Sequence, residues 1–238
     1  MKRLFALSPR LQAVADLVPH GAALTDVGSD HGRLPVWLVK NGIVPRAVAT
    51  DLRAAPLGRG QELARRWEVT DRIDFRLCDG LSAVTSREAE VVTIAGMGGE
   101  TIAGILAAAP WTGETGHCYI LQAMSGMDGL RRYLSENGFL ICREVLVPEG
   151  ETLYVILFAQ PGEMPPLTLG EIWVGRQWQG MESPLRNFYL AEELRKLRRA
   201  AEGLCRSQHP GDEEKRDRFE QAAREVAEMK KEWEQWQR

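Results

Sequence analysis

The sequence has few cysteines and histidines, and neither residue type is clustered. The four cysteines stand far apart without a CxxC pair, and the four histidines are scattered. We therefore expect no disulfide framework and no metal site. Three of the cysteines lie in apolar runs, where we expect them as small core residues, and the free thiols favour a reducing cytoplasm over secretion. The cysteines are Cys78, Cys118, Cys142 and Cys205.

Long apolar runs and an excess of positive charge are also absent. No run reaches the ~18 residues that a membrane-spanning helix needs, and the N-terminus lacks the apolar core of a signal peptide. The formal net charge of −3 argues against a chain that binds nucleic acid through overall basicity, while a local basic patch stays open. We predict a cytoplasmic protein without a membrane partner. Its oligomeric state is open, with a monomer favoured.

The first two thirds of the chain alternate between short apolar strands and helical segments. This alternation occurs five times, and two further strands follow that are joined only by residues 148–151. So short a link requires an antiparallel pair, because a parallel return needs a dozen or more residues. Residues 1–160 therefore predict one α/β domain, a doubly wound and mostly parallel sheet of seven strands with one antiparallel strand near its edge. The expected strands span 24–27, 46–51, 73–78, 91–95, 118–122, 139–147 and 152–159, and a helix is expected within residues 1–20.

The last third has a different pattern. Residues 161–182 are rich in proline and glycine and predict a linker. In residues 183–238, apolar residues recur at steps of three and four on both sides of His209-Pro210-Gly211. This spacing is typical of an antiparallel helical hairpin with a coiled-coil seam.

The stretch from Asp26 to Gly32 predicts a ligand site. An apolar strand leads into it and a helix leaves it, so free backbone N–H groups gather at the carboxyl end of the strand. Asp51 ends the next strand, near the ~20-residue spacing at which an acid binds both hydroxyls of a ribose. Asp79 ends the third strand, where it could accept a hydrogen bond from an adenine amino group. Gly28 and Gly32 do not match G-x-G-x-x-G, so S-adenosylmethionine fits better than a dinucleotide.

Simpler interpretations stand beside this one. A single strand-end aspartate is more often a helix cap or turn former, and His31 alone is more often structural. The glycine-rich run 96–99 is either a tight turn or a floor for a flat base beside the methyl donor. No Asn/Asp-Pro-Pro-aromatic motif follows this strand, which favours a ring nitrogen over an exocyclic amine as the methyl acceptor. Such a nitrogen has its own lone pair and needs no proton removed, so methyl transfer to it depends mainly on its alignment with the methyl carbon.

Three motifs together resemble the bacterial tRNA adenine-22 N1-methyltransferases: residues 26–31 (DVGSDH), 93–99 (TIAGMGG) and 7–11 (LSPRL). The resemblance covers most of residues 5–160. It implies a Rossmann-like class I methyltransferase fold with a C-terminal coiled coil. It also implies S-adenosylmethionine as the donor and N1 of an adenine in the tRNA D-arm as the acceptor. By position, it puts the cofactor on Asp26, Gly28, Ser29, Asp30, His31, Asp51, Asp79, Gly80, Ala95, Gly96 and Met97.

The same resemblance suggests residues for chemistry and for RNA. The catalytic candidates are Asp30, His31, Arg33 and Met97. The RNA candidates are Arg10, Arg33, Gly98, Gly99, Gln122, Arg195 and Arg199, with further positive charge at Lys2, Arg3 and Arg206, although a charged helix face is often merely solvated. Two positions differ from the family: Gly32-Arg33 replaces its usual Ala-Tyr, and Ala123-Met124 replaces its Pro-Asn. Arg33 could still stack on a base or bind phosphate.

Other functions remain open at this stage. The chain could methylate another RNA, a protein or a small molecule, and in the last two cases activity would survive removal of the tail after residue 182. It could also be a non-catalytic scaffold that binds the cofactor and holds a partner through its coiled coil. A nicotinamide-dependent oxidoreductase fits the motifs least.

Overall fold

A computed structural model describes residues 5–205 and 211–237 and divides the chain after Met164 into two compact units. The predicted charges Lys2, Arg3 and Arg206 and the predicted turn at His209-Pro210 lie outside the described residues. Among the helices of the described part, none has the length and hydropathy needed to cross a membrane.

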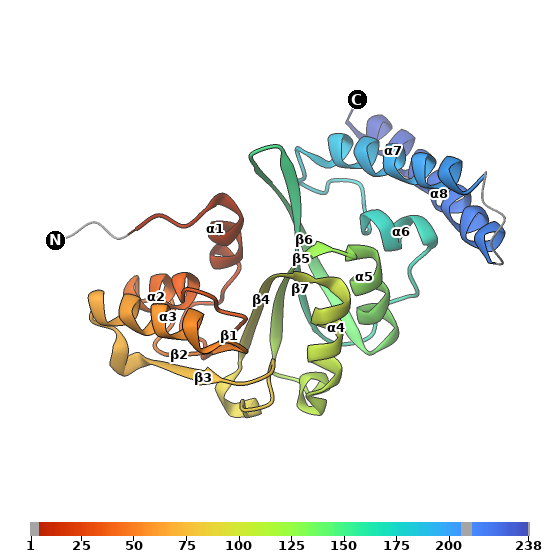
Figure 1. The fold of residues 1–238 in the computed structure, drawn as a ribbon. Coiled ribbons are helices and arrows are strands. Elements are labelled where there is room, and N and C mark those ends of the chain that lie inside the picture. The colour runs from red at the N-terminus through yellow and green to blue at the C-terminus, as the bar shows by residue number, and fades with distance from the viewer. Residues whose placement is uncertain (1–4, 206–210, 238) are drawn as a thin grey trace. The chain divides into compact units, whose positions relative to one another are not determined.

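The first unit is built on one seven-stranded sheet within the described residues, in the order β3-β2-β1-β4-β5-β7-β6 (Figure 1). Strands β1 to β5 pair in parallel, and β7 is antiparallel to both β5 and β6. The predicted doubly wound sheet with one antiparallel strand is therefore confirmed. The strands are β1 (Leu24–Val27), β2 (Ala47–Asp51), β3 (Ile73–Leu77), β4 (Val91–Gly98), β5 (Cys118–Ser125), β6 (Phe139–Glu149) and β7 (Thr152–Pro161).

Helices connect the parallel strands. They are α1 (Pro9–Asp16), α2 (Arg33–Lys40), α3 (Ala54–Arg66), α4 (Gly99–Ala107) and α5 (Met127–Glu136), with 3-10 turns η1 (Thr70–Arg72), η2 (Ser86–Glu88) and η3 (Pro110–Gly113). The hydroxyl of Ser8 caps α1, with Pro9 in the first turn. The helix lies within the predicted range 1–20, and Pro19 disfavours its continuation through Val18.

The core of the first unit lies along the central strands. All residues of β1 and β2 are buried, as are Val91–Ile94 of β4, as expected for parallel strands covered on both faces. The expectation of buried cysteines is wrong for Cys142, which is exposed. It stands at an irregularity between Ile141 and Arg143 on β6, the edge strand, where side chains lack a neighbouring strand on one side.

The second unit contains α6 (Leu169–Val174), α7 (Arg186–Leu204) and α8 (Asp212–Trp236). Helices α7 and α8 pack against each other, as predicted for a hairpin. Helix α6 lies within the predicted linker 161–182, so that prediction is wrong for these residues. Thr168 caps α6 in a capping box, and the Gly170 N–H donates to Glu225 of α8 at 2.6 Å. The domain boundary at 160 otherwise stays a prediction.

Candidate functional site

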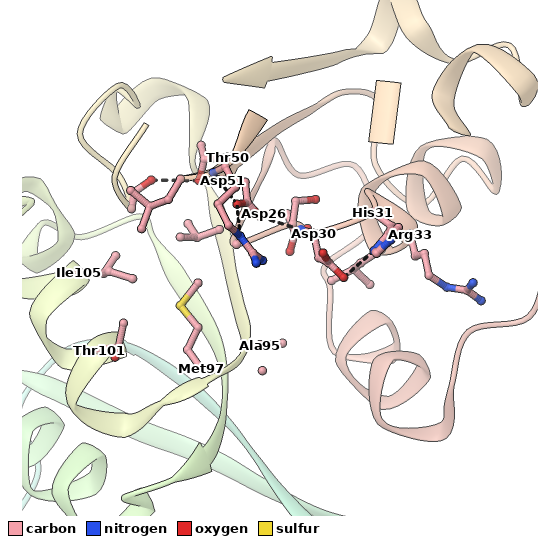
Figure 2. A pocket seen from close by; sticks show the side chains of 18 of the residues that line it. Asp26, Asp30, His31, Arg33, Thr50, Asp51, Ala95, Met97, Thr101 and Ile105 are labelled. Atoms are coloured by element: carbon pink, nitrogen blue, oxygen red, sulfur yellow. Dashed lines mark hydrogen bonds and ion pairs between the residues drawn. The ribbon is translucent and has the colours of Figure 1, made fainter. Parts of the chain in front are cut away.

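A cleft of about 560 Å³ opens at the carboxyl ends of β1, β2 and β4. The strand order reverses between β1 and β4, which is where doubly wound sheets bind ligands. Figure 2 shows Asp26, Asp30 and Asp51 together, with Met97 pointing toward them from β4. Thirteen of the predicted residues line this cleft: Arg10, Asp26, Gly28, Ser29, Asp30, His31, Arg33, Asp51, Asp79, Gly80, Ala95, Gly96 and Met97.

The turn after β1 is tied to β2 through its backbone. The Ser29 N–H donates to the Thr50 carbonyl at 2.9 Å, and the Asp30 N–H donates to Asp51 Oδ2 at 3.1 Å. Gly28 has a φ of +67°, and a Cβ there would lie 2.1 Å from Met97 Cε. A side chain at position 28 would therefore be strained and would displace Met97. The glycine lets the backbone and the Met97 side chain approach each other in the cleft.

Asp51 is the acid best placed for a sugar diol. Its side chain is buried at the end of β2, and it accepts hydrogen bonds from the backbone N–H groups of Asp30 and Arg53, at 3.1 Å and 2.9 Å. These bonds fix the orientation of the carboxylate and leave acceptor capacity on both oxygens. Asp79 is exposed at the same cleft, beyond the end of β3.

Asp26 is buried at the end of β1. Burial raises the pKa of its carboxyl to about 6, while a 2.6 Å hydrogen bond donated by the Thr93 hydroxyl opposes the rise. The Ser29 hydroxyl is close enough to lower this pKa as well, but it forms no regular hydrogen bond with any described residue. An orphaned buried hydroxyl beside a buried carboxyl, both on the cleft wall, fits a ligand that supplies the missing partners.

The substitution Asp26→Asn should change how the free energy of unfolding depends on pH. The pKa of the Asp26 carboxyl is higher in the folded protein than in the unfolded chain. Its ionisation therefore does not affect the free energy of unfolding below about pH 4, and lowers it most above about pH 6. Between pH 5 and pH 7 the free energy of unfolding of the wild type should fall by about 1 kcal/mol, and that of Asp26→Asn should show no such fall. Urea unfolding of both proteins at the two pH values measures this. Parallel pH profiles would contradict the raised pKa.

Asp30 and His31 form a pair at the mouth of the cleft. His31 Nδ1 lies 2.6 Å from Asp30 Oδ2, and both side chains are exposed. Asp30 has a φ of +49°, a left-handed conformation that non-glycine residues rarely adopt. The hydrogen bond from its N–H to Asp51 holds this conformation. Strain at an exposed charged residue on a cleft is a feature of functional sites.

Arg33 is not directed at the centre of the cleft. Its Nη2 donates to the Ala6 carbonyl at 2.7 Å, and its guanidinium lies 5.0 Å from the Phe5 ring centre. Figure 2 shows the side chain turned away from Met97. The expected stacking on a base is therefore not supported by this geometry. The neighbouring Gly32 is needed for packing, because a Cβ there would lie 2.9 Å from Gly60 Cα on α3.

Five of the seven predicted RNA residues lie outside the residues that line the cleft: Gly98, Gly99, Gln122, Arg195 and Arg199. Gly99 is buried at the start of α4, where a Cβ would lie 2.0 Å from the Gly126 carbonyl oxygen. Gln122 is fully buried and accepts from the Gly96 N–H at 3.1 Å. Gln122 therefore supports the cleft residue Gly96 from behind, whereas Gly99 is required by packing at the start of α4. Arg195 and Arg199 lie on α7 in the second unit, and Arg195 pairs with Glu192 at 2.7 Å.

The sequence reasoning missed several cleft residues. Leu52 follows Asp51 and is 67% exposed, while Ile105 and Thr101 face the cleft from α4 (Figure 2). An exposed leucine beside a buried strand-end acid offers an apolar face to a flat ring, and its position directly after Asp51 was a usable signal. The other missed residues are Leu11, Val27, Leu34, Thr50, Arg53 and Cys78. Among the described residues, no group of three or more His, Cys, Asp or Glu side chains is arranged to hold a metal ion.

Comparison with known proteins places this geometry in a family. A family model described as "Methyltransferase domain" matches residues 7–157. The tRNA (adenine(22)-N(1))-methyltransferase of Bacillus subtilis is 34% identical over a match that spans 66% of each chain.

Two solved structures resemble the chain over nearly its full length. The B. subtilis m1A22 tRNA methyltransferase TrmK has a TM-score of 0.82 and 27% identity, covering 93% of this chain and 98% of that one. Streptococcus pneumoniae Sp1610, assigned as a tRNA (m1A22) methyltransferase and solved with S-adenosyl-L-methionine, has a TM-score of 0.78 and 32% identity, covering 93% and 99%. The chain therefore belongs to the methyltransferase-domain family and, within it, to the bacterial tRNA (adenine-22-N1)-methyltransferases.

Proposed function

We propose that this protein transfers a methyl group from S-adenosyl-L-methionine to N1 of adenine 22 in the D-arm of tRNA. The observation that carries the proposal is one cleft that joins the Gly28 turn, the buried diol acceptor Asp51 and Met97, in a chain that matches TrmK over 98% of that protein's length. A tRNA partner implies the cytoplasm as the place of action.

The cleft residues fit the donor. Asp51 would accept both ribose hydroxyls, and Leu52 and Ile105 would contact the adenine ring from two elements, with Asp79 and Gly80 at its edge. The Ser29 hydroxyl has spare hydrogen-bonding capacity on the same wall. When bound, the donor supplies a methyl carbon attached to a positively charged sulfur.

The acceptor side is formed by Met97 and the Asp30–His31 pair. Met97 is half-buried on β4 and offers a flat, apolar surface to a base. N1 of adenine needs no proton removed before it attacks, so holding the base in line with the methyl carbon is the main task. Transfer leaves a positive charge on the adenine ring, and the Asp30 carboxylate, oriented by His31, would stabilise that charge.

The direct test uses an unmodified tRNA transcript with adenine at position 22, incubated with the protein and the donor. Nucleoside mass analysis should find 1-methyladenosine in this transcript. A transcript with guanine at position 22 is the matched control and should stay unmodified. Methylation of both transcripts would point to another nucleotide, and methylation of neither would leave a different acceptor or a non-catalytic scaffold.

The substitution Met97→Glu should abolish methylation while the protein stays folded. A carboxylate at this partly exposed position costs little stability, but it removes the apolar contact for the base and repels RNA. We expect the rate to fall at least ~100-fold, measured as 1-methyladenosine formed per minute, with Met97→Leu as the control that keeps the apolar surface. An unchanged rate for Met97→Glu would show that the base does not lie there.

The substitution Asp30→Asn should lower kcat about 10-fold with little effect on donor affinity. Asparagine tolerates a left-handed φ, so the turn is kept while the negative charge is lost. Single-turnover methylation measures the rate, and calorimetry with S-adenosyl-L-homocysteine measures the affinity. A loss of affinity with an unchanged rate would instead assign Asp30 to donor binding.

A further inference from the structure

Helix α3 carries arginines whose charge no carboxylate neutralises. It begins directly after Arg53, which lines the cleft, and its own charged residues are Arg59, Arg65, Arg66 and one acid, Glu62. The three arginines of the helix are exposed, and no carboxylate of the described residues lies within ion-pair distance of them. The first turn of α3 holds no acid either. The helix therefore presents uncompensated positive charge to solvent, starting at the edge of the cleft.

The cations of the second unit are mostly compensated within their own helices. Arg195 pairs with Glu192 at 2.7 Å, and Lys196 pairs with Glu193 at 2.7 Å. The other cations of α7 and α8 that pair with a carboxylate of the same helix are Lys215, Arg216, Arg224, Lys230 and Lys231. Among the described residues of these helices, the exposed cations without such a partner are Arg198, Arg199 and Arg218. Unpaired positive charge is thus denser on α3, where every arginine is unpaired.

The part of α3 nearest to the cleft has small side chains. Ala54 and Ala55 are exposed in its first turn, and Gly58 follows one turn later. A Cβ at Gly58 would meet no atom within 4 Å, so the packing of the described residues does not require glycine there. Glycine is unfavourable in the interior of a helix. Small residues beside the arginines let a bulky, charged chain come close to the helix.

The helical period sets the arginines in two neighbouring lines on the exposed face. Arg65 follows Gly58 by seven residues and so lies on the same side of the helix two turns later. Arg59 and Arg66 are also seven residues apart and form the second line, with Glu62 between the two lines as the one acid of the helix. The face extends over a helix roughly 20 Å long. Its length and charge fit a polyanion that contacts several arginines at once.

The place of this face indicates which polyanion it meets. The Arg53 side chain, at the start of α3, is 73% exposed, and Leu52 beside it also lines the cleft. A nucleobase held in the cleft remains attached to its backbone, so the phosphates on either side of it leave the cleft along its rim. The planar fork of arginine suits phosphate oxygens. An acidic protein would match the charge of this face but not its position beside a cleft that holds a base.

We infer that the exposed face of α3, defined by Gly58, Arg59, Arg65 and Arg66, binds phosphates of the tRNA strand that carries the target adenine. This inference rests on the proposed function and adds a surface of the first unit to the RNA contacts expected from the sequence. Phosphate contacts hold and orient the strand without reading its bases, so the choice of base is left to the cleft. They also make the affinity depend steeply on salt.

The triple variant Arg59→Gln, Arg65→Gln, Arg66→Gln tests the role of the charge. Glutamine is a good helix former, so α3 should be kept. Fluorescence anisotropy with an unmodified tRNA transcript, between about 50 and 200 mM KCl, should show binding weakened at least ~10-fold at the lowest salt. The slope of log Kd against log salt should decrease by roughly 2 to 3. Affinity for S-adenosyl-L-homocysteine should be unchanged, because these residues do not line the cleft.

Interference by phosphate ethylation locates the contact on the RNA. In the wild type, ethylation of phosphates within a few nucleotides of adenine 22 should reduce binding. The α3 triple variant should lose this interference. The matched control is Arg195→Gln, Lys196→Gln, Arg199→Gln on α7, which removes the same amount of charge and should keep the interference near adenine 22.

The substitution Gly58→Glu tests the same face without removing an arginine. The new side chain enters open space and favours the helix, so the melting temperature should not fall, but its carboxylate lies beside the proposed path of the RNA. We expect tRNA affinity to fall at least ~5-fold, with donor affinity unchanged. Gly203→Glu on α7 is the matched control, because a Cβ there also meets no atom within 4 Å, and it should leave tRNA affinity close to that of the wild type.

Unchanged tRNA affinity and salt slope in the α3 triple variant would overturn the inference, as would interference near adenine 22 that persists in it. A loss of affinity in Gly203→Glu without one in Gly58→Glu would also overturn it and would return RNA binding to α7. If the wild type binds no tRNA and forms no 1-methyladenosine, the proposed function itself fails, which the transcript assay shows separately.

Discussion

Asp51→Ala should weaken binding of S-adenosyl-L-homocysteine by roughly 5- to 150-fold, equivalent to about 1–3 kcal/mol. The carboxylate is buried at the end of β2 and is oriented by two backbone N–H groups before any ligand arrives. Its loss would remove the acceptor that we propose for both ribose hydroxyls, and no other described carboxylate at the end of β2 can replace it. It also frees the Asp30 N–H, so the turn after β1 loses one of its ties.

The affinity is measured by calorimetry, with thermal unfolding as a check that the variant is folded. Asp71→Ala is the matched control, since Asp71 is an exposed acid of the same unit that does not line the cleft. We expect its affinity to equal that of the wild type. If Asp51→Ala binds the ligand as tightly as the wild type does, the ribose does not lie at Asp51 and the orientation proposed for the donor is wrong.

The strand-end acids could be predicted from the sequence because each of them follows a local apolar run. Asp26, Asp51 and Asp79 each end or follow a short run of strand-forming residues. Because the carboxyl ends of parallel strands meet at one edge of a sheet, the three were expected in one cleft, and all three line it. Their placement together with Gly96 confirms that part of the prediction. Their contacts with a ligand stay a prediction.

Residues whose role depends on a distant partner could not be assigned in this way. Arg10 and Gln122 are separated by 112 positions, and nothing local to either residue indicates their 2.6 Å hydrogen bond. Arg33 was assigned to a base contact because it replaces the family's tyrosine after the DVGSDH motif. In the structure its guanidinium instead donates to the carbonyl of Ala6 in the N-terminal segment. Helix α6 had a local signal, the capping box of Thr168 and Glu171, but the surrounding prolines and glycines suggested a linker, and its contact with Glu225 comes from a helix 55 positions away.

The glycine-rich run 96–99 looks like one motif in the sequence, but the structure requires glycine at its two ends for different reasons. Gly96 has a φ of +86°, a left-handed conformation, and donates its N–H to Gln122, so it shapes the cleft. Gly99 is fixed by packing of α4 against the loop before α5. The sequence indicated that another group approaches this run closely. A surface for a flat base could explain glycine at position 96, but not at position 99.

Gly99→Ala should lower the free energy of unfolding by about 3 kcal/mol or more. The added Cβ would lie 2.0 Å from the Gly126 carbonyl oxygen and 2.8 Å from its carbon. Both atoms belong to the backbone, so no side-chain rotation relieves the clash, and the start of α4 must move away from α5. For a chain of this size, we expect the melting temperature to fall roughly 6–12 °C.

Gly104→Ala is the matched control, because it makes the same substitution in the same helix. A Cβ at Gly104 meets no atom within 4 Å, and Gly104 lies in the interior of α4. Alanine is the better helix former there and also restricts the unfolded chain, so stability should rise by about 0.4–1 kcal/mol. Calorimetric melting of the two variants beside the wild type should therefore give shifts of opposite sign. Equal shifts would show that helix propensity, and not the contact with Gly126, sets the requirement for glycine at position 99.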